Sequence, residues 1–206
     1  MKKDGTIAMF RYWNMLRAGR AVPSRTEIDP TAIKARLPDT FILEFDENQK
    51  LRFRLAGTNI CSLFARELRH LPFSHVWRDD DRNTVAALAE TTLLKNAVVY
   101  AEAEGRTAHG RCAAFEILLL PLDGGPGMPR AIGIASPVTR PFWMGSHPIV
   151  DFELKSARIV DPEAPIVIDV GHETPSLAPD IIELAGATSR RVRHLLVLDG
   201  GRSDRH

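Results

Sequence analysis

The stretch that decides the fold is LRFRLAGTNICSLFARELRH, residues 51–70. Apolar residues alternate with arginines over its first five positions, which is the pattern of a strand with one buried face. Ala56-Gly57-Thr58 then breaks the strand and begins a short helix, which we expect to end at Leu68. No nucleophile motif, metal-ligand cluster or phosphate-binding loop falls in this stretch. It therefore predicts a strand-to-helix corner of a sensor-type core rather than a catalytic centre.

The residues just upstream predict the partner of this strand. Residues 41–45 alternate in the same way, and the polar residues 46–49 between the two runs predict a hairpin turn. Because both apolar sets are expected on one face, the alternation also predicts the pairing register. The predicted pairs are Phe45 with Leu51, Leu43 with Phe53, and Glu44 with Arg52 on the outer face.

One longer helix and three more strands are predicted farther along the chain. The helix is expected over residues 79–96, where three aspartates at the start favour a helix N-terminus. The strands are expected at 98–106, 112–122 and 130–138. The order of two strands, helices and three strands predicts an α+β fold, with a five-stranded antiparallel sheet and helices packed on one face.

An amphipathic N-terminal helix is predicted over residues 6–19, ahead of the sheet. Its apolar face must be buried either against the domain's own sheet or against a second copy of the chain. A further short helix is expected from Asp29-Pro30 to the residue before Pro38. The candidate dimer or partner contacts on the first helix are Met9, Phe10, Trp13 and Leu16.

The C-terminal part of the chain differs in composition from the sheet region. Prolines, acids and small residues predict a linker over 160–177, and a short helix at 179–187 and a strand-like run at 194–198 follow. The predicted organisation is an N-terminal helical segment at 1–38, a sensor core at 39–140 and a partly flexible C-terminal extension at 141–206.

The composition limits the partners and the compartment. Lys and Arg number 27 and Asp and Glu 26, and the resulting net charge of +1 creates no overall field for nucleic acid or an anionic membrane. Apolar runs are too short for a spanning helix, and charged residues interrupt the N-terminus where a signal peptide would be apolar. The two cysteines, Cys61 and Cys112, form no CxxC pair, so we expect reduced thiols and a cytoplasmic protein.

Cofactor and catalytic chemistry find little support in the sequence. Cys61 follows Asn59-Ile60, but the spacing and flanking residues fit a flavin-binding photosensor poorly, and a packed thiol is the favoured interpretation. His70 and His75 precede the long helix, where an axial haem ligand could stand, yet that helix contains no histidine. We therefore expect neither flavin nor haem, and we find no catalytic triad and no metal-ligand set.

A family resemblance is carried by several short motifs in this order: RYWNMLRAGRAVPSR, LPDTFILEF, RFRLAGTNIC, EILLLPL and PFWMG, with HLLVLDGGR in the tail. Together they resemble stand-alone bacterial PAS-domain proteins, in which a helix precedes the PAS core and a short tail follows it. The resemblance spans about residues 8–158. One departure lies in FARELRH, where Ala65 and then His70 stand in place of an expected glycine at a backbone turn.

The resemblance implies a non-enzymatic sensory or protein-interaction module of bacterial signal transduction. Such a module would bind a small apolar ligand inside the sheet and act through a signalling protein partner, as a homodimer and without nucleic acid or membrane contact. The alternative is a structural homodimer or adaptor whose core is filled by its own side chains. The residues predicted to line a ligand cavity are Phe53, Leu55, Phe64, Val85, Leu88, Tyr100, Phe115, Ile117 and Ile132.

Overall fold

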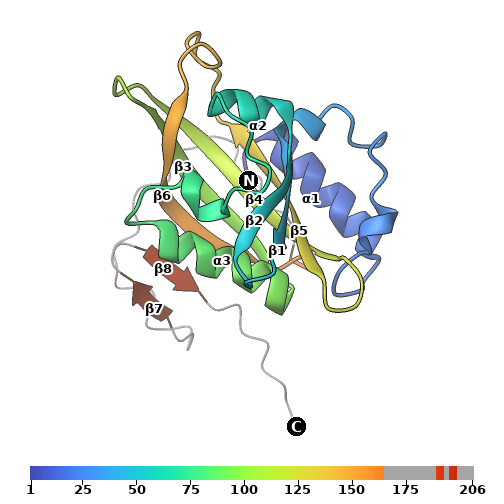
Figure 1. Ribbon diagram of the computed structural model, residues 1–206. Coiled ribbons are helices and arrows are strands. Elements are labelled where there is room, and N and C mark those ends of the chain that lie inside the picture. Colours follow the sequence, from blue (N-terminus) through green and yellow to red (C-terminus); the bar gives the residue numbers. More distant parts are fainter. Residues whose placement is uncertain (165–188, 193–194, 199–206) are drawn as a thin grey trace.

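The computed structural model describes residues 1–164 and the two short strands at 189–192 and 195–198 (Figure 1). Its centre is an antiparallel sheet with the strand order β2-β1-β5-β4-β3-β6. The strands are β1 (Thr40–Phe45), β2 (Leu51–Ala56), β3 (Val98–Thr107), β4 (Cys112–Asp123), β5 (Pro129–Pro137) and β6 (Ile149–Val160). The helices are α1 (Asp4–Arg17), α2 (Thr58–Leu63) and α3 (Arg82–Lys95), with short 3-10 turns η1 (Arg25–Glu27), η2 (Leu37–Asp39) and η3 (Phe73–Val76).

The α+β class is confirmed, but the main sheet has six strands and not five. The additional strand, β6, pairs with β3 along its whole length, so the sheet continues into the region assigned to the C-terminal extension. A separate two-stranded antiparallel sheet pairs β7 (Ser189–Val192) with β8 (Leu195–Leu198). A strand-like run was expected at the position of β8, and β7 was not predicted. From residue 165 onward, the predicted linker at 160–177 and the predicted helix at 179–187 lie outside the described residues.

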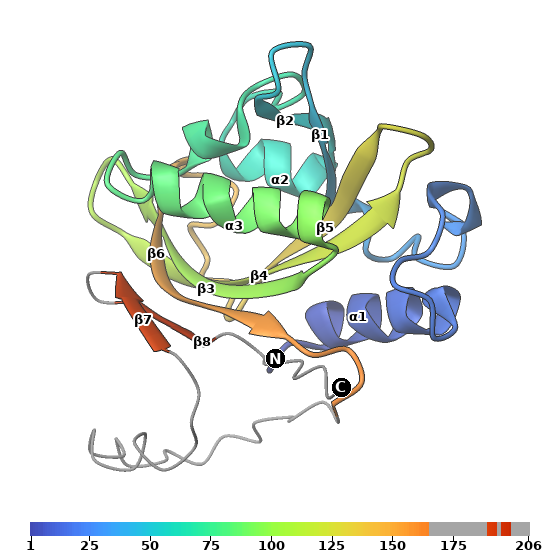
Figure 2. The same ribbon diagram turned by 90° about the horizontal axis from the view of Figure 1, so that it is seen from below.

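Both faces of the sheet are covered, and each has its own apolar core (Figure 2). On the inner face, β-sheet residues pack under α2, η3 and α3, as predicted. On the outer face, α1 lies across β4 and β5. Two-sided burial explains why β4 reads as an almost continuous apolar run, a pattern that hides which face a residue occupies. None of the helices in the described part of the chain has the length and apolar content that a membrane crossing requires.

The hairpin of β1 and β2 has the predicted register at its turn end. All three predicted pairs are present, and Arg52 contacts Glu44 with Nη2 to Oε1 at 3.0 Å. Farther along, Ile42 pairs with Leu55, so Arg54 is an extra residue on β2 and forms a β-bulge. The Arg54 side chain lies on the outer face with that of Arg52, and its Nη1 lies 3.0 Å from Glu44 Oε2.

The apolar face of α1 is buried by the chain's own sheet. Met9, Phe10 and Trp13 are each no more than 2% exposed, and the indole Nε1 of Trp13 donates a hydrogen bond to the carbonyl of Pro121 at 2.7 Å. Leu16 is half-buried. The prediction that these residues form a dimer or partner contact is therefore wrong for the three buried ones, because the sheet already occupies that face.

The backbone just before α1 is also tied to the sheet. Glu116 of β4 is 1% exposed, and its carboxylate accepts hydrogen bonds from the backbone N–H groups of Lys2 and Lys3 and from the Tyr100 hydroxyl. Burial by itself raises the pKa of this carboxyl, but these hydrogen bonds outweigh it and lower the pKa overall. The buried carboxylate therefore fixes the start of α1 over β3 and β4.

Two predicted helical segments differ from the structure. Residues 30–36 form successive turns with hydrogen bonds between residues three apart, and not a regular helix. The helix α2 ends at Leu63, five residues before the predicted end, and Ala65 and His70 in the following connector both adopt positive φ. The departure from glycine noted in FARELRH thus falls on two left-handed backbone positions, where glycine would be less strained.

The start of the long helix is used to hold the missed strand. The helix α3 begins at Arg82, and the carboxylate of Asp81 accepts a hydrogen bond from the backbone N–H of Leu154 in β6 at 2.9 Å. Asn96, with a φ of 56°, ends the helix in the left-handed conformation. The aspartates at the helix start were expected to favour the helix dipole, and Asp81 in addition links α3 to the sheet edge.

Replacement of Trp13 tests the assignment of α1 to the chain's own core. We expect Trp13→Ala to lower the free energy of unfolding by about 3–5 kcal/mol, because a large buried side chain and its hydrogen bond are lost. Met15→Ala, at a 65% exposed position of the same helix, should change it by less than about 0.5 kcal/mol. Urea unfolding followed by circular dichroism measures the free energy of unfolding of both variants. If the free energy of unfolding of the wild type itself fell on dilution, Trp13 would be buried by a second copy instead.

Replacement of Glu44 tests the outer-face ion pairs. Burial raises the pKa of Glu44, but hydrogen bonds from Arg54 and Arg52 outweigh this and lower the pKa overall. The ionised carboxylate therefore contributes its full stabilisation at pH values above the ordinary glutamate pKa of about 4.3. We expect Glu44→Gln to cost about 1–3 kcal/mol at neutral pH, a difference that shrinks as the pH falls below about 4. Glu90→Gln, at an exposed site of α3, is the control. A pH-independent difference in urea unfolding would contradict the assignment.

Candidate functional site

Most of the residues predicted to line a ligand cavity lie together in the inner core. They come from β2, from the end of α2, from α3 and from β4, and all of them contact the same apolar cluster. These six residues are Phe53, Phe64, Val85, Leu88, Phe115 and Ile117.

The other three predicted lining residues lie elsewhere, and the prediction of a single shared lining is wrong for them. Tyr100 and Ile132 belong to the outer core under α1. Around Ile132, β5 is apolar and buried on both faces, so its sequence does not mark the face. In β3, Ala101 and Ala103 alternate with Glu102 and Glu104, and Tyr100 shares the face of the glutamates. Leu55 is 47% exposed, because the bulge at Arg54 turns it to the outer side of the sheet.

The inner core is filled by the protein's own side chains. The cavity left between α3, η3 and the sheet measures about 10 Å³, which is room for about one water molecule. Phe152 of β6 occupies the middle, with its ring centroid 5.0 Å from that of Phe115, 5.3 Å from Phe64 and 5.5 Å from Trp77. The strand that the sequence analysis missed therefore supplies the side chain that closes the expected ligand site.

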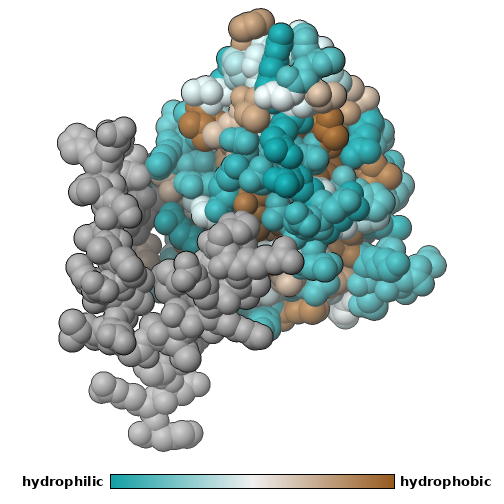
Figure 3. Space-filling model, turned by 90° about the vertical axis from the view of Figure 1, so that its left-hand side faces the viewer, coloured by the Kyte–Doolittle hydropathy of each residue, from teal (hydrophilic) through white to brown (hydrophobic). Residues whose placement is uncertain are grey.

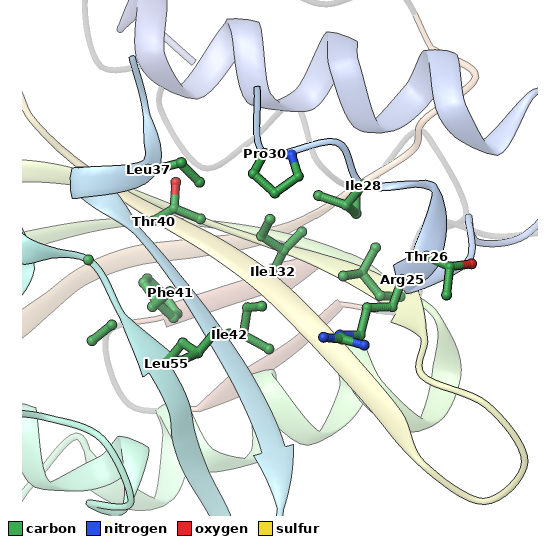
Figure 4. A pocket seen from close by; sticks show the side chains of 13 residues that line it. Arg25, Thr26, Ile28, Pro30, Leu37, Thr40, Phe41, Ile42, Leu55 and Ile132 are labelled. Carbon is green, nitrogen blue, oxygen red and sulfur yellow. The ribbon is translucent and has the colours of Figure 1, made fainter. Parts of the chain in front are cut away.

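A larger groove lies on the outer face, beside α1 (Figure 4). Its volume is about 490 Å³. Ile42, Leu55 and Ile132 form the floor from three neighbouring strands, and Pro30 and Ile28 face them from the connecting segment, residues 18–39, which joins α1 to β1. The groove thus lies between the sheet and a segment of irregular backbone.

The connecting segment is fixed at several points. The backbone N–H of Asp123 donates to the carbonyl of Pro23 at 3.0 Å, and the N–H of Asp29 donates to the hydroxyl of Tyr12 on α1 at 2.8 Å. Ser24 and Glu27 form a capping box around η1. These bonds hold the wall of the groove against both α1 and the end of β4.

Positive charge gathers at one end of the groove. Glu44 is paired with Arg52 and Arg54 at 3.0 Å each, and Arg130 Nη2 lies 4.0 Å from it. Arg25 lines the groove itself and is exposed. Burial and the neighbouring Arg54 and Arg25 lower the pKa of Arg130, while Glu44 opposes this shift. The carboxylate of Glu44 therefore faces three guanidinium groups, and Arg25 adds a fourth positive charge that acts on Arg130.

The residues considered for cofactor chemistry lie outside both the groove and the inner cavity. His70 and His75 are exposed. Cys61 is half-buried in α2, where burial raises its thiol pKa, and Cys112 is exposed at the start of β4, so the two thiols stand in different elements. Within the described ranges, no group of three or more His, Cys, Asp and Glu side chains is placed to hold a metal ion.

The groove is distinguished by its largely apolar lining. On the face shown in Figure 3, the described residues are mostly hydrophilic and the apolar ones are scattered. Scattered apolar residues are ordinary on a protein surface, whereas a concave apolar site with a few charged groups is typical of ligand binding. The outer groove is therefore the candidate site.

The sequence held one signal for this groove. Ile42 is apolar although the alternation of β1 assigns it to the outer face, and Leu55 opposite becomes its neighbour once the bulge is known. Arg25 and the connecting segment carried no such signal, because turns without regular periodicity do not show what they cover.

The chain is similar to solved structures over about half of its length. No curated protein has significant similarity to the chain. Among solved structures, the chain is similar to the PAS domain of a protein from Colwellia psychrerythraea, with 15% identity, a TM-score of 0.39 and coverage of 54% of this chain and 98% of the other. It is also similar to a variant of RsLOV, with 16% identity, a TM-score of 0.37 and coverage of 54% and 68%. At these identities and scores the two likenesses add nothing about the site.

A family model described as a PAS domain matches residues 1–136 of the 206. This match includes α1, the connecting segment and the first five strands, so it covers every element that builds the groove. The chain belongs to the PAS domain family, whose members are commonly sensory or interaction modules.

Proposed function

We propose that the protein is a non-enzymatic sensory module of bacterial signal transduction, which binds a small apolar ligand in the outer groove. The observation that carries this proposal is the groove itself. Its volume of about 490 Å³ lies in the range of about 300–1,000 Å³ that is usual for small-molecule sites, and most of its lining is apolar. The inner cavity of about 10 Å³ is too small for the same role.

A ligand in the groove would contact elements that can respond to it. It would touch the floor strands and the connecting segment at the same time, and tighter binding to one arrangement of that segment shifts the population toward it. The connecting segment is joined directly to α1, so a change in the segment would reach the outer core. We propose that the ligand signal reaches a partner protein through this part of the surface.

A second contact for a partner is the loop between β5 and β6. Phe142 in this loop is 90% exposed, and the guanidinium of Arg111 lies 5.7 Å from its ring centroid. Exposed aromatic and arginine side chains are frequent anchors in protein interfaces. These side chains support contact with a signalling protein partner or with a second copy of the chain. We propose that the protein is cytoplasmic and that contact with a second copy forms a homodimer.

The second candidate function is a structural homodimer or adaptor without a ligand. The filled inner core favours it, because Phe152 packs against three aromatic rings where a ligand would otherwise lie. The two functions differ in their use of the groove. A sensor needs the groove to accept an apolar molecule, and an adaptor does not.

A carboxylate placed in the groove floor tests the sensor proposal. We expect the purified wild type to bind the uncharged dye Nile red with increased fluorescence, and Leu55→Glu to weaken this binding at least about tenfold, because burying a carboxylate against an apolar ligand is costly. Leu94→Glu is the matched control, since this leucine of α3 is 64% exposed and lies on the other side of the sheet. Fluorescence titration and urea unfolding of all three proteins separate binding from folding.

The outcomes distinguish the two functions. Loss of binding in Leu55→Glu alone supports the outer groove as the site. Equal binding by all three proteins would place the dye elsewhere, and failure of the wild type to bind would favour the adaptor.

A further inference from the structure

Arg130 is a buried cation whose hydrogen bonds are incomplete. It is 8% exposed, and its Nε has no hydrogen-bond partner among the residues that the structure describes. Its aliphatic part packs where a Cβ on Gly124 would approach the Cγ and Cδ atoms to 3.1 Å. A guanidinium held in place with a free buried donor is costly unless a further acceptor reaches it.

Glu44 satisfies Arg130 only in part. The carboxylate of Glu44 is engaged by Arg52 and Arg54 at 3.0 Å, and Arg130 reaches it only at 4.0 Å, beyond a hydrogen bond. Arg25 adds a further positive charge and forms no ion pair with the residues described. Positive charge therefore exceeds negative charge around Arg130 and Arg25.

The strand register places this cation beside the apolar groove. Arg130 precedes the floor residue Ile132 by two positions on β5, so both side chains leave the same face. It also pairs across the ladder with Leu122, which lines the groove. Arg25 lines the same end from the connecting segment (Figure 4). The groove is thus apolar along its length and cationic at one end.

We propose that the groove binds a straight-chain carboxylate of the fatty-acid class, with the hydrocarbon chain on the apolar floor and the carboxylate at Arg130 and Arg25. This inference rests on the proposed function, because it names the ligand class for the same groove. A carboxylate has two acceptor oxygens that match the edge of a guanidinium, so it supplies the partner that Arg130 Nε lacks. An uncharged chain would gain only the apolar contacts.

Ligands that share a chain and differ in the head group test the proposal. Isothermal titration calorimetry with the full chain, stripped of bound lipid, would compare dodecanoate, dodecan-1-ol and dodecyl phosphate below their aggregation concentrations. We expect dodecanoate to bind about tenfold to a hundredfold more tightly than dodecan-1-ol, and high salt to narrow this gap.

Two arginine variants localise the head group. Arg130→Gln should remove most of the preference for dodecanoate, and Arg25→Gln, at an exposed position, should weaken dodecanoate about threefold without changing dodecan-1-ol. Arg158→Gln is the control, because Arg158 is exposed on β6 at the opposite edge of the sheet from β2. If Arg130→Gln does not fold, the Arg25→Gln variant alone tests the position of the carboxylate. An unchanged affinity of that variant for dodecanoate overturns the proposal.

The wild-type results separate this inference from the proposed function. Equal affinities for dodecanoate and dodecan-1-ol overturn the carboxylate assignment and leave an apolar-ligand sensor. Tighter binding of dodecyl phosphate than of dodecanoate overturns it in favour of a phosphate head group. Binding of none of the three overturns both proposals.

Discussion

Trp13 packs on the outer face of a sheet whose inner face is already covered by α2, η3 and α3, and its indole is bonded to the carbonyl of Pro121. This contact makes the sheet the middle of three layers. The central strands β4 and β5 must therefore be apolar on both faces, and α1 cannot offer its apolar side to a second copy. The positions of the connecting segment and the groove follow, since the chain must cross the outer face from the end of α1 to the start of β1.

The same layering moves the available cavity from one face to the other. On the inner face, β6 brings Phe152 into contact with Phe64, Trp77 and Phe115, and these rings leave little space. On the outer face, α1 covers β4 and β5, and in the described part of the chain the floor beyond it on β1 and β2 is covered by turns of the connecting segment. Turns pack less completely than a helix with a continuous apolar stripe, so the groove forms there.

The sequence predicted the pairing of β1 with β2 better than it predicted which face of the sheet each residue occupies. The register at Glu44 and Arg52 followed from alternation next to a short turn, where few alternatives exist. The bulge at Arg54 could not be read, because one extra residue changes the face of Leu55 without changing the composition of the strand. The sixth strand was missed because β6 alternates charged and apolar residues in a region that was assigned to a C-terminal extension, and its pairing with β3 is distant in sequence.

The bulge also links the apolar and the cationic parts of the candidate site. A regular strand would keep Leu55 on the inner face with Phe53, and Arg54 would alternate to the outer face without its neighbour. With the bulge, Leu55 joins the groove floor while Arg54 keeps its contact with Glu44, so the irregularity adds an apolar contact next to an existing charge. Glu44 then pairs with the two arginines of β2, and the described residues offer no hydrogen-bond acceptor to the Nε of Arg130 on the other side. Because an unsatisfied buried donor is costly, an acceptor that enters the groove from solvent gains most at Arg130.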